Sequence, residues 1–355
     1  MRVLQLIDSL RPGGAEKMAV NIANALLPHI DGSYLCCTRQ EGLLKEQLKP
    51  EVEYLFLNKK SSLDLSAFLR LRKFIFRNKI TIVHAHSTSF FLASIIKKSG
   101  LKFNLIWHDH YGESEFLEKR EYKLLKFFSG SFTGIISVNS DLKNWAQKNL
   151  NCKNVVEIRN FISEPTPSLD QKTLIKDPEK SFKIICVANL RPQKDHFNLL
   201  SAFEMLDPTM SVSLHLIGEN PGTLYSVAFL EAISKSPVKQ KIFYYGTQTE
   251  IIYLLKQADL GILASKSEGL PLALLEYGMA GLPVVCTRVG KCAELIGSAG
   301  KIVERENPSA LYNGILFYLR NRDKMKLDAE RFKFQTEKFS EKEVLKNLLQ
   351  CYKLC

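Results

Sequence analysis

The chain has 355 residues, of which 45% are hydrophobic and 24% are charged, and its formal net charge is +12. This composition excludes an intrinsically disordered chain, because the apolar residues suffice to fill the cores of about two ordinary domains. The eight cysteines form no C-x-x-C pair, which favours reduced thiols over a disulfide framework or a zinc site.

The start of the chain and its apolar runs indicate no membrane-spanning segment. Residues 1–8 become polar too early for a signal peptide and are typical of a first strand. No apolar run approaches the roughly 20 residues that a spanning helix needs. We expect a cytoplasmic protein that is soluble, or peripheral at the inner face of the cell membrane.

The positive charge is concentrated in the first half of the chain. Residues 1–160 contain 24 Lys and Arg against 15 Asp and Glu, whereas the remainder contains 25 against 22. A basic half favours an anionic partner: a phospholipid surface, a polyprenyl phosphate or nucleic acid. A solubilising surface explains the same charge. Nucleic acid is disfavoured, because the basic residues form no recognised binding module and no aromatic stacking pattern.

Short strand-like runs alternate with helix-length segments along the whole chain. In the first half the expected strands are Val3–Ile7, Tyr34–Cys37, Val52–Leu57, Thr81–His84, Asn104–Trp107, Gly134–Val138 and Val155–Ile158. The Pro/Ser-rich stretch 163–170 is the expected linker. The alternation then restarts with Lys183–Ala188, Ser213–Ile217, Lys241–Tyr245, Leu260–Leu263, Pro283–Cys286 and Lys301–Val303. An amphipathic helix, Ser340–Tyr352, ends the chain.

This alternation predicts an α/β fold of two Rossmann-like domains, each with a parallel sheet, that face a central cleft. The expected domains are residues 1–165 and 175–338, and the final helix, 340–355, is expected to pack back on the first. Ligands bind such sheets at the carboxyl ends of the strands.

Two groups of residues at strand ends stand out in the first half. Gly13 and Gly14 follow the first strand, where paired glycines let the backbone approach a ligand closely. Such a turn is equally often a mere tight turn. Four of the seven histidines, His84, His86, His108 and His110, lie at the ends of two neighbouring strands. Core packing does not require this clustering, so we expect a site role for some of them and a structural role for the others. Metal binding is a minor option, because the cluster lacks a standard zinc ligand set.

The second half carries basic residues and glycines at the same kind of position. Arg191 and Lys194 follow its first strand, and both can reach a diphosphate, Arg as a planar fork and Lys as a point charge. A solvated charged turn is the alternative. Gly218 and Gly246 end the next two strands, as expected of a rim that faces a ligand.

The segment from Ser265 to Glu276 is the most informative part of the chain. It places Glu268 before a Gly-Leu-Pro turn and Glu276 eight residues later, within a helix expected at Leu272–Ala280. Pro271 suits the first helical position, because its missing N–H would have no partner there. A helix N-terminus binds phosphate, and carboxylates accept hydrogen bonds from sugar hydroxyls. The segment therefore predicts a nucleotide-sugar site.

In chain order these loops resemble glycosyltransferase family 4, the group 1 retaining transferases of GT-B fold that act in bacterial surface polysaccharide assembly. The resemblance implies that Glu268 contacts the donor sugar near O3 and O4, and that Glu276 binds the ribose hydroxyls. It places the backbone of Gly269 and Leu270 at the sugar and diphosphate. The glycines expected at the donor are Gly13, Gly14, Gly218 and Gly246.

The same resemblance assigns roles to basic residues and histidines. Lys194 matches the lysine that stabilises the leaving diphosphate. The family usually has an arginine five residues earlier, where this chain has Asn189, and we expect Arg191 to substitute. His108 matches a histidine close to the reacting sugar, whereas His86 and His110 are candidates on the acceptor side.

The resemblance also implies the partners. We expect a metal-independent enzyme without a cofactor, because no Asp-x-Asp motif occurs, and a UDP-sugar donor in preference to a GDP-sugar. The expected acceptor is a lipid-linked glycan at an anionic membrane surface, and no nucleic acid is involved. The alternatives are a sugar-nucleotide epimerase of the same fold and a non-enzymatic nucleic-acid-binding protein.

Overall fold

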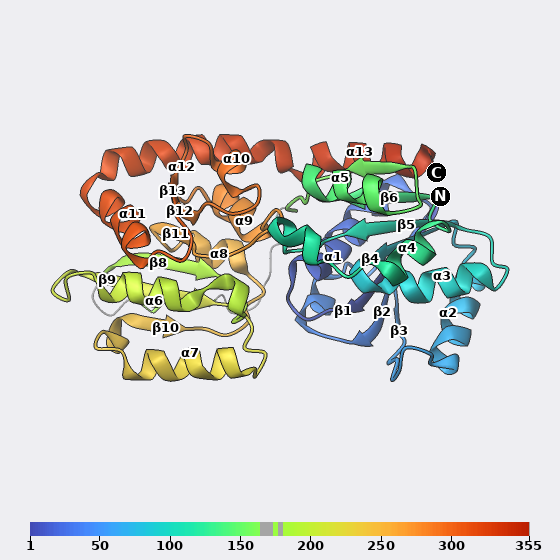
Figure 1. The fold of residues 1–355 in the computed structure, drawn as a ribbon, viewed down its shortest axis with the longest axis horizontal. Helices are drawn as coiled ribbons and strands as arrows, with labels where there is room; N and C mark the ends of the chain where they lie inside the picture. The colour runs from blue at the N-terminus through green and yellow to red at the C-terminus, as the bar shows by residue number, and fades with distance from the viewer. Residues whose placement is uncertain (164–172, 177–179, 355) are drawn as a thin grey trace. The chain divides into compact units, whose positions relative to one another are not determined.

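The computed structural model describes residues 1–163, 173–176 and 180–354, apart from the side chains of residues 114 and 115. The expected linker, 163–170, lies outside this description except for its first residue. The chain divides into two compact units: Met1–Ser163 together with Phe339–Cys355, and Glu164–Lys338. Each unit is an α/β layer structure with helices on both faces of a parallel sheet (Figure 1).

The first unit contains seven strands in the order β3-β2-β1-β4-β5-β6-β7, all pairs parallel. Its strands are β1 Arg2–Ser9, β2 Gly32–Gln40, β3 Glu53–Phe56, β4 Ile82–His86, β5 Asn104–Asp109, β6 Gly134–Ser137 and β7 Val155–Glu157. Its helices are α1 Gly14–Leu26, α2 Leu65–Arg77, α3 Phe90–Lys98, α4 Lys123–Ser129, α5 Ser140–Asn149 and α13 Glu341–Leu354.

The two faces of this sheet differ in chemistry. On β4, Val83 and Ala85 pack into the apolar core that includes residues of α2 and α3. Because successive strand residues point to opposite faces, His84 and His86 lie on the other face. The C-terminal helix α13 covers them there, since the buried side chain of Tyr352 contacts His84. The end of the chain is thus part of the first unit.

In the second unit the described residues form a six-stranded sheet in the order β10-β9-β8-β11-β12-β13, again all parallel. Its strands are β8 Phe182–Val187, β9 Val212–Ile217, β10 Ile242–Tyr244, β11 Leu260–Leu263, β12 Val284–Thr287 and β13 Lys301–Val303. Its helices are α6 His196–Glu204, α7 Leu224–Lys235, α8 Ile251–Leu255, α9 Leu272–Ala280, α10 Cys292–Ile296, α11 Pro308–Arg320 and α12 Arg322–Thr336.

Strand order decides where a ligand site forms in such sheets. In each sheet the first strand along the chain, β1 or β8, is central. The next two strands add on one side of it, and the chain then crosses to the other side, where β4 or β11 pairs with it. The loops that leave β1, β4, β8 and β11 therefore flank the point at which the strand order reverses. Crevices at such points are the usual ligand sites of open α/β sheets. The sequence-predicted fold class, two Rossmann-like domains of parallel sheet, is confirmed.

Candidate functional site

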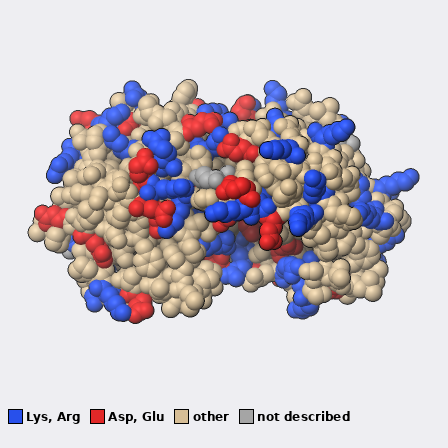
Figure 2. Space-filling view, viewed as in Figure 1, with Lys and Arg blue, Asp and Glu red and all other residues tan. Residues whose placement is uncertain are grey.

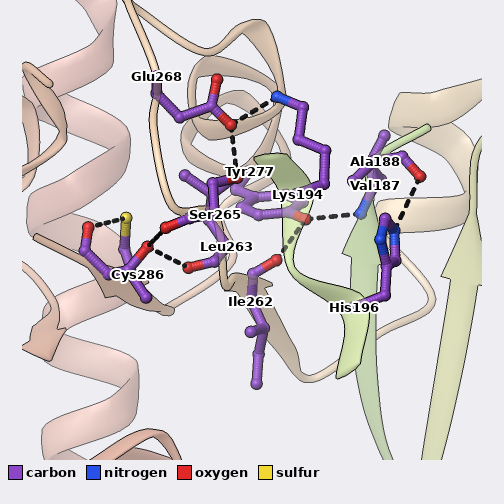
Figure 3. A network of polar contacts seen from close by, with 11 residues as sticks. Val187, Ala188, Lys194, His196, Ile262, Leu263, Ser265, Glu268, Tyr277 and Cys286 are labelled. Carbon is purple, nitrogen blue, oxygen red and sulfur yellow. Dashed lines mark hydrogen bonds and ion pairs between the residues drawn. The ribbon is translucent and has the colours of Figure 1, made fainter. Parts of the chain in front are cut away.

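In the second unit, the loops after β8 and β11 join through one ion pair. Lys194 closes a short 3₁₀ turn, Pro192–Lys194, and its Nζ lies 2.5 Å from Oε1 of Glu268 (Figure 3). The Ser265 hydroxyl donates a second hydrogen bond, of 2.6 Å, to the same oxygen. The Lys194 side chain is 22% exposed and that of Glu268 only 7%. The two strongest candidates of the sequence thus form one charged pair at the switch point of the sheet.

The backbone around Glu268 is held by its neighbours. Thr287, at the end of β12, donates from Oγ1 to the Ser265 carbonyl at 2.7 Å. Gly290 packs so closely that a Cβ there would lie 2.0 Å from the Glu268 carbonyl oxygen. Lys266 donates its backbone N–H to the Gln193 carbonyl at 2.8 Å. These contacts fix the backbone of the loop that carries the Glu268 carboxylate, and none of them involves helix α9.

Helix α9 has the expected bounds, but its first residue is Leu272, which corrects the role expected for Pro271. Pro271 has extended backbone angles (φ −70°, ψ 125°) and is the N-cap rather than the first helical residue. The helix ends at Gly281, whose φ of +72° is the left-handed conformation that glycine tolerates best. Glu276 lies within the helix and is 3% exposed.

Tyr277, next to Glu276, ties the helix to the sheet. Its hydroxyl accepts the Val187 N–H at 2.8 Å and donates to the Ile262 carbonyl at 3.0 Å (Figure 3). These bonds link α9 to both strands, β8 and β11, whose loops carry the ion pair. No sequence-based expectation assigned a site role to Tyr277, Ser265, Thr287 or Gly290. Only Ser265 had a local signal, a hydroxyl three residues before a carboxylate.

The remaining predicted donor residues of this unit lie on the same set of loops. Gly218 approaches the β8 loop so closely that a Cβ there would lie 1.9 Å from the Ala188 carbonyl oxygen. Its N–H donates to the Gly246 carbonyl at 2.9 Å, which joins the loops after β9 and β10. Asn189, at the position of the family arginine, accepts the Glu219 N–H at 2.9 Å. Asn189 therefore supports this loop.

The other predicted residues on these loops differ in exposure. Arg191 is exposed, and its guanidinium makes no ion pair with any residue that the structure describes. Gly269 and Leu270 are buried, and the Gly269 carbonyl accepts the Lys291 N–H at 3.3 Å. Lys194 is thus the basic residue that the fold holds in place, whereas Arg191 projects from the loop.

In the first unit, the predicted residues lie on the loops after β1, β4 and β5. Gly13 caps α1 and Gly14 is its first residue. A Cβ at Gly13 would lie 2.2 Å from Oε2 of Glu16, so the loop packs against a side chain of its own helix. His86 pairs with His108 across β4 and β5, and His110 follows the end of β5.

The four histidines form a connected cluster rather than separate site residues. Nε2 of His84 lies 3.1 Å from Nδ1 of His108, and Nδ1 of His86 lies 3.0 Å from Nε2 of His110. His84, His86 and His108 are fully buried, whereas His110 is half-buried. Burial lowers the pKa of His84 and His110 to about 3, and it holds the pKa of His86 and His108 well below the usual value. All four are therefore neutral at pH 7.

Three of these histidines also satisfy the distance criterion for a metal site. Ligating nitrogens of His84, His86 and His108 lie within 4.8 Å of one another. Hydrogen bonds within the cluster and to Tyr352 and Gln5 already use five of the six ring nitrogens of these three histidines. Nε2 of His108 is the exception, since it is buried and has no hydrogen-bond partner among the residues that the structure describes.

No helix within the described ranges is long and apolar enough to cross a membrane.

Comparisons with known proteins place the chain in a family. The model for "Glycosyltransferase Family 4" matches residues 12–164, and that for "Glycosyl transferases group 1" matches residues 170–336. The O-antigen biosynthesis glycosyltransferase WbnH of Escherichia coli is 23% identical over 349 residues, which cover 96% of this chain and 95% of that protein. The N-acetyl-alpha-D-glucosaminyl L-malate synthase of Bacillus anthracis is 27% identical over 153 residues, 42% of this chain and 39% of that enzyme.

Solved structures show the same fold along the whole chain. HepE of Anabaena, in complex with UDP-glucose, superposes with a TM-score of 0.81 at 18% identity, covering all of both chains. Sucrose-phosphate synthase of Thermosynechococcus elongatus gives a TM-score of 0.80 at 13% identity, with 99% and 98% covered. The fold is that of the GT-B glycosyltransferases, and the protein is an enzyme of this class. The chain belongs to glycosyltransferase family 4, group 1.

Proposed function

We propose that the protein is a retaining hexosyltransferase that moves a sugar from a nucleotide diphosphate donor to a hydroxyl of a lipid-linked glycan, in the synthesis of a surface polysaccharide or glycoconjugate. The observation that carries this proposal is the Lys194–Glu268 pair at the switch point of the second sheet. A carboxylate accepts hydrogen bonds from sugar hydroxyls, and a fixed ammonium attracts a diphosphate. Glu268 also lies just before the N-terminus of α9, which can bind phosphate.

The charge that develops during transfer determines the role of each group. Cleavage of the glycosidic bond places negative charge on the β-phosphate. Lys194, Arg191 and the free N–H groups at the start of α9 stabilise that charge as it forms. Glu268 holds the sugar at O3 and O4, and Glu276 holds the ribose. With these cationic and dipolar groups at the phosphate, the reaction proceeds without a metal ion.

We infer a front-face reaction. The sugar becomes oxocarbenium-like, and the acceptor hydroxyl attacks from the face that the phosphate leaves. The departing phosphate takes the acceptor's proton, so the anomeric configuration is retained without a dedicated protein base. His108 lies close to the reacting sugar, and His86 and His110 lie on the side of the acceptor.

The comparisons support a choice of donor and acceptor. Solved structures of Anabaena HepE contain UDP and UDP-glucose, which favours a UDP-sugar over a GDP-sugar. A Campylobacter jejuni relative, 25% identical over 283 residues, is named for transfer of N-acetylgalactosamine to an undecaprenol-linked glycan. An Escherichia coli relative, 23% identical over 286 residues, is named for galactose transfer to a diphosphoundecaprenol-linked sugar.

The surface of the first unit supports docking at the inner face of the cell membrane. On α2, Leu65, Leu69 and Phe76 are 67%, 53% and 75% exposed, and on α4 Phe127 is 68% exposed. On the face drawn in Figure 2, Lys and Arg side chains near these helices have few acidic neighbours. Apolar side chains surrounded by basic ones bind anionic lipid surfaces. Flotation with liposomes tests this proposal.

A donor screen with mass analysis of the products tests the reaction itself. Purified enzyme is incubated with UDP- and GDP-sugars and with undecaprenyl-diphosphate-linked acceptors, with and without excess EDTA. We expect transfer from a UDP-sugar that persists in EDTA. Loss of transfer in EDTA that is restored by manganese or magnesium would contradict the proposed phosphate chemistry. An altered UDP-sugar formed without an acceptor would identify an epimerase instead.

A further inference from the structure

The buried histidine cluster of the first unit is connected to two other polar side chains. Gln5 is on β1, and its Oε1 lies 2.9 Å from Nε2 of His86. Tyr352 is on α13, and its hydroxyl oxygen lies 2.5 Å from Nδ1 of His84. Gln5 Nε2 lies 3.5 Å from the Tyr352 hydroxyl, which joins the two contacts. We call the set Gln5, His84, His86, His108, His110 and Tyr352 the histidine relay.

The amide of Gln5 gives the first branch of the relay its direction. An amide oxygen can only accept, so Nε2 of His86 must carry the proton in this contact. A neutral imidazole then has a lone pair on its other nitrogen, and Nδ1 of His86 accepts from Nε2–H of His110. The branch therefore ends with an unprotonated Nδ1 on His110.

The second branch runs through Tyr352. The Gln5 amide nitrogen can only donate, so the Tyr352 oxygen accepts from it and the tyrosine proton is directed to Nδ1 of His84. Nε2–H of His84 then donates to Nδ1 of His108. This leaves the proton of His108 on Nε2, the buried atom for which the described part of the chain supplies no partner. Most buried polar groups are paired, so this N–H requires an explanation.

We propose that Gln5 and Tyr352 are positioning residues that fix the tautomers of the four histidines, so that the end of β5 offers an N–H donor on His108 beside a lone pair on His110. The two rings lie 3.9 Å apart between centroids. A sugar hydroxyl both donates and accepts, so a polyol is the ligand class that matches this pair. This inference rests on the proposed function for its ligand but not for its tautomers.

The same assignment disfavours a metal ion in the cluster. Nδ1 of His84, His86 and His108 each already accepts a hydrogen bond, and Nε2 of each carries a proton. The one lone pair that the relay leaves over is on His110, outside the three-histidine set. A metal ion would have to displace the protons and bonds that connect the relay.

Long-range ¹H–¹⁵N NMR spectra of the full chain with ¹⁵N-labelled histidine decide the tautomers. The chain has only seven histidines, and single His→Gln variants assign the signals. At pH 7 we expect the four relay histidines in a single Nε2–H form. An Nδ1–H form at His86 or His110, or an imidazolium at any of the four, would overturn the proposal.

Tyr352→Phe tests the positioning role. Without the hydroxyl, either direction of the His84–His108 bond is open, so we expect a mixture of tautomers there and no change at His86 and His110, which serve as the internal control. Unchanged spectra at all four positions would refute control by Tyr352. Tyr318→Phe is the matched stability control, because it removes a buried tyrosine hydroxyl that donates to Asp328 in the second unit.

Turnover and zinc binding complete the test. With a UDP-sugar that the wild type uses, Tyr352→Phe should lower kcat about tenfold, equivalent to about 1.4 kcal/mol, with little change in the donor KM. An equal kcat in the Tyr352 and Tyr318 variants would refute the positioning role. If the wild type transfers no sugar, the proposed function fails while the spectra still decide the tautomers. One tightly bound Zn²⁺ per chain, lost in His84→Gln, would overturn the relay in favour of a metal site.

Discussion

The Lys194–Glu268 pair shows how two residues at different loops depend on each other. They are 74 positions apart in the chain, and Glu268 also accepts from Ser265. Buried carboxylates are tolerated only when they are paired and hydrogen-bonded. The Glu268 carboxylate is thus both paired with Lys194 and hydrogen-bonded to Ser265, and Lys194 is held where we propose that phosphate charge develops.

Substitution of either partner should affect turnover far more than folding. We expect Lys194→Ala and Glu268→Ala each to slow transfer by about a hundredfold or more, the usual loss for a group that stabilises a transition state. Arg288→Ala is the control, because Arg288 is 60% exposed and pairs only with Glu304 among the described ion pairs. Initial rates with the donor found by screening measure the effect. Near-normal rates in either variant would remove the donor-site assignment.

Arg191 should contribute less than Lys194. Its side chain is exposed and forms no ion pair in the described structure, so substrate must order it at an entropic cost. We expect Arg191→Ala to slow transfer by less than about tenfold, the effect of a flexible surface charge rather than a fixed contact. Steady-state transfer rates of the Arg191→Ala and Lys194→Ala variants, measured side by side, compare the two contributions. A larger loss at Arg191 would mean that donor binding reorganises the β8 loop.

Local sequence signals identified the carboxylates and the lysine, but not the contacts among them. The Glu268–Glu276 spacing and the Gly-Leu-Pro turn lie within one segment. The Lys194–Glu268 bond, the Asn189 contact with Glu219 and the Tyr352–His84 contact join residues 74, 30 and 268 positions apart. Such pairs depend on strand order, which no local pattern specifies.

Among the helices, α9 has the bounds expected from the sequence because its boundary signals are strong. An apolar run follows Pro271, and Gly281 supplies the left-handed C-cap, so both ends are determined locally. What the sequence did not show is that the preceding loop is held by Gly290 from the turn after β12.

A substitution at Gly290 tests this contact. Gly290 has φ +45°, and a Cβ there would lie 2.0 Å from the Glu268 carbonyl oxygen. Gly290→Ala should destabilise the second unit by about 1 to 3 kcal/mol through overpacking and should impair transfer by moving Glu268. Gly281→Ala is the matched control, since its φ is also positive, at +72°, but nothing lies within 4 Å. Equal turnover in the two variants would show that the Glu268 loop does not depend on this contact.

At the scale of the whole molecule, the sequence predicted both sheets because parallel strands are continuous apolar runs. The expected bounds of β11 and β13 match the structure, and those of the other strands differ by at most three residues, for example Thr81–His84 against Ile82–His86 for β4. The clustering of the four histidines was visible in the sequence, but the contacts that join them in a buried polar layer were not. Alternation on β4 directs His84 and His86 away from the apolar core, and α13, from the far end of the chain, packs over His84 through Tyr352.

This polar interior should make the first unit sensitive to acid. Above pH 6.5 the relay histidines are neutral both folded and unfolded. As pH falls below that value the unfolded chain takes up protons, whereas the folded pKa of His84 and His110 is about 3. Stability is therefore lost progressively between about pH 6.5 and 3, by up to about 1.4 kcal/mol per pH unit for each histidine.

Tryptophan fluorescence in urea at pH 7, 6 and 5 measures this loss, because both tryptophans, Trp107 and Trp145, lie in the first unit. His84→Gln should reduce the slope of unfolding free energy against pH by about the contribution of one buried histidine. His29→Gln, at an exposed position, should leave that slope unchanged. A flat dependence from pH 7 to 5 in the wild type would contradict burial of neutral imidazoles.

Membrane docking belongs to the surface of the first unit, and the structure shows which residues can test it. Arg70 donates to the Leu57 carbonyl, and Arg72 bonds both the carbonyl and the hydroxyl of Ser99, so reversing these charges would disturb the fold. Four other basic residues on α2 and α4 are exposed: Lys73, Arg77, Lys123 and Lys126. Each basic residue near an anionic surface contributes about 1 kcal/mol, an attraction that salt screens.

Changing these four residues to Glu should abolish flotation with anionic liposomes at low salt, while hydrolysis of the donor continues because the second unit is unchanged. The matched control reverses four exposed lysines of the second unit, Lys239, Lys256, Lys326 and Lys333, which alters net charge by the same amount. If net charge alone drove binding, both variants would lose it. If the surface of α2 and α4 is the docking site, only the first variant does. A wild type that stays in the aqueous fraction at low salt would refute membrane docking and favour a soluble acceptor.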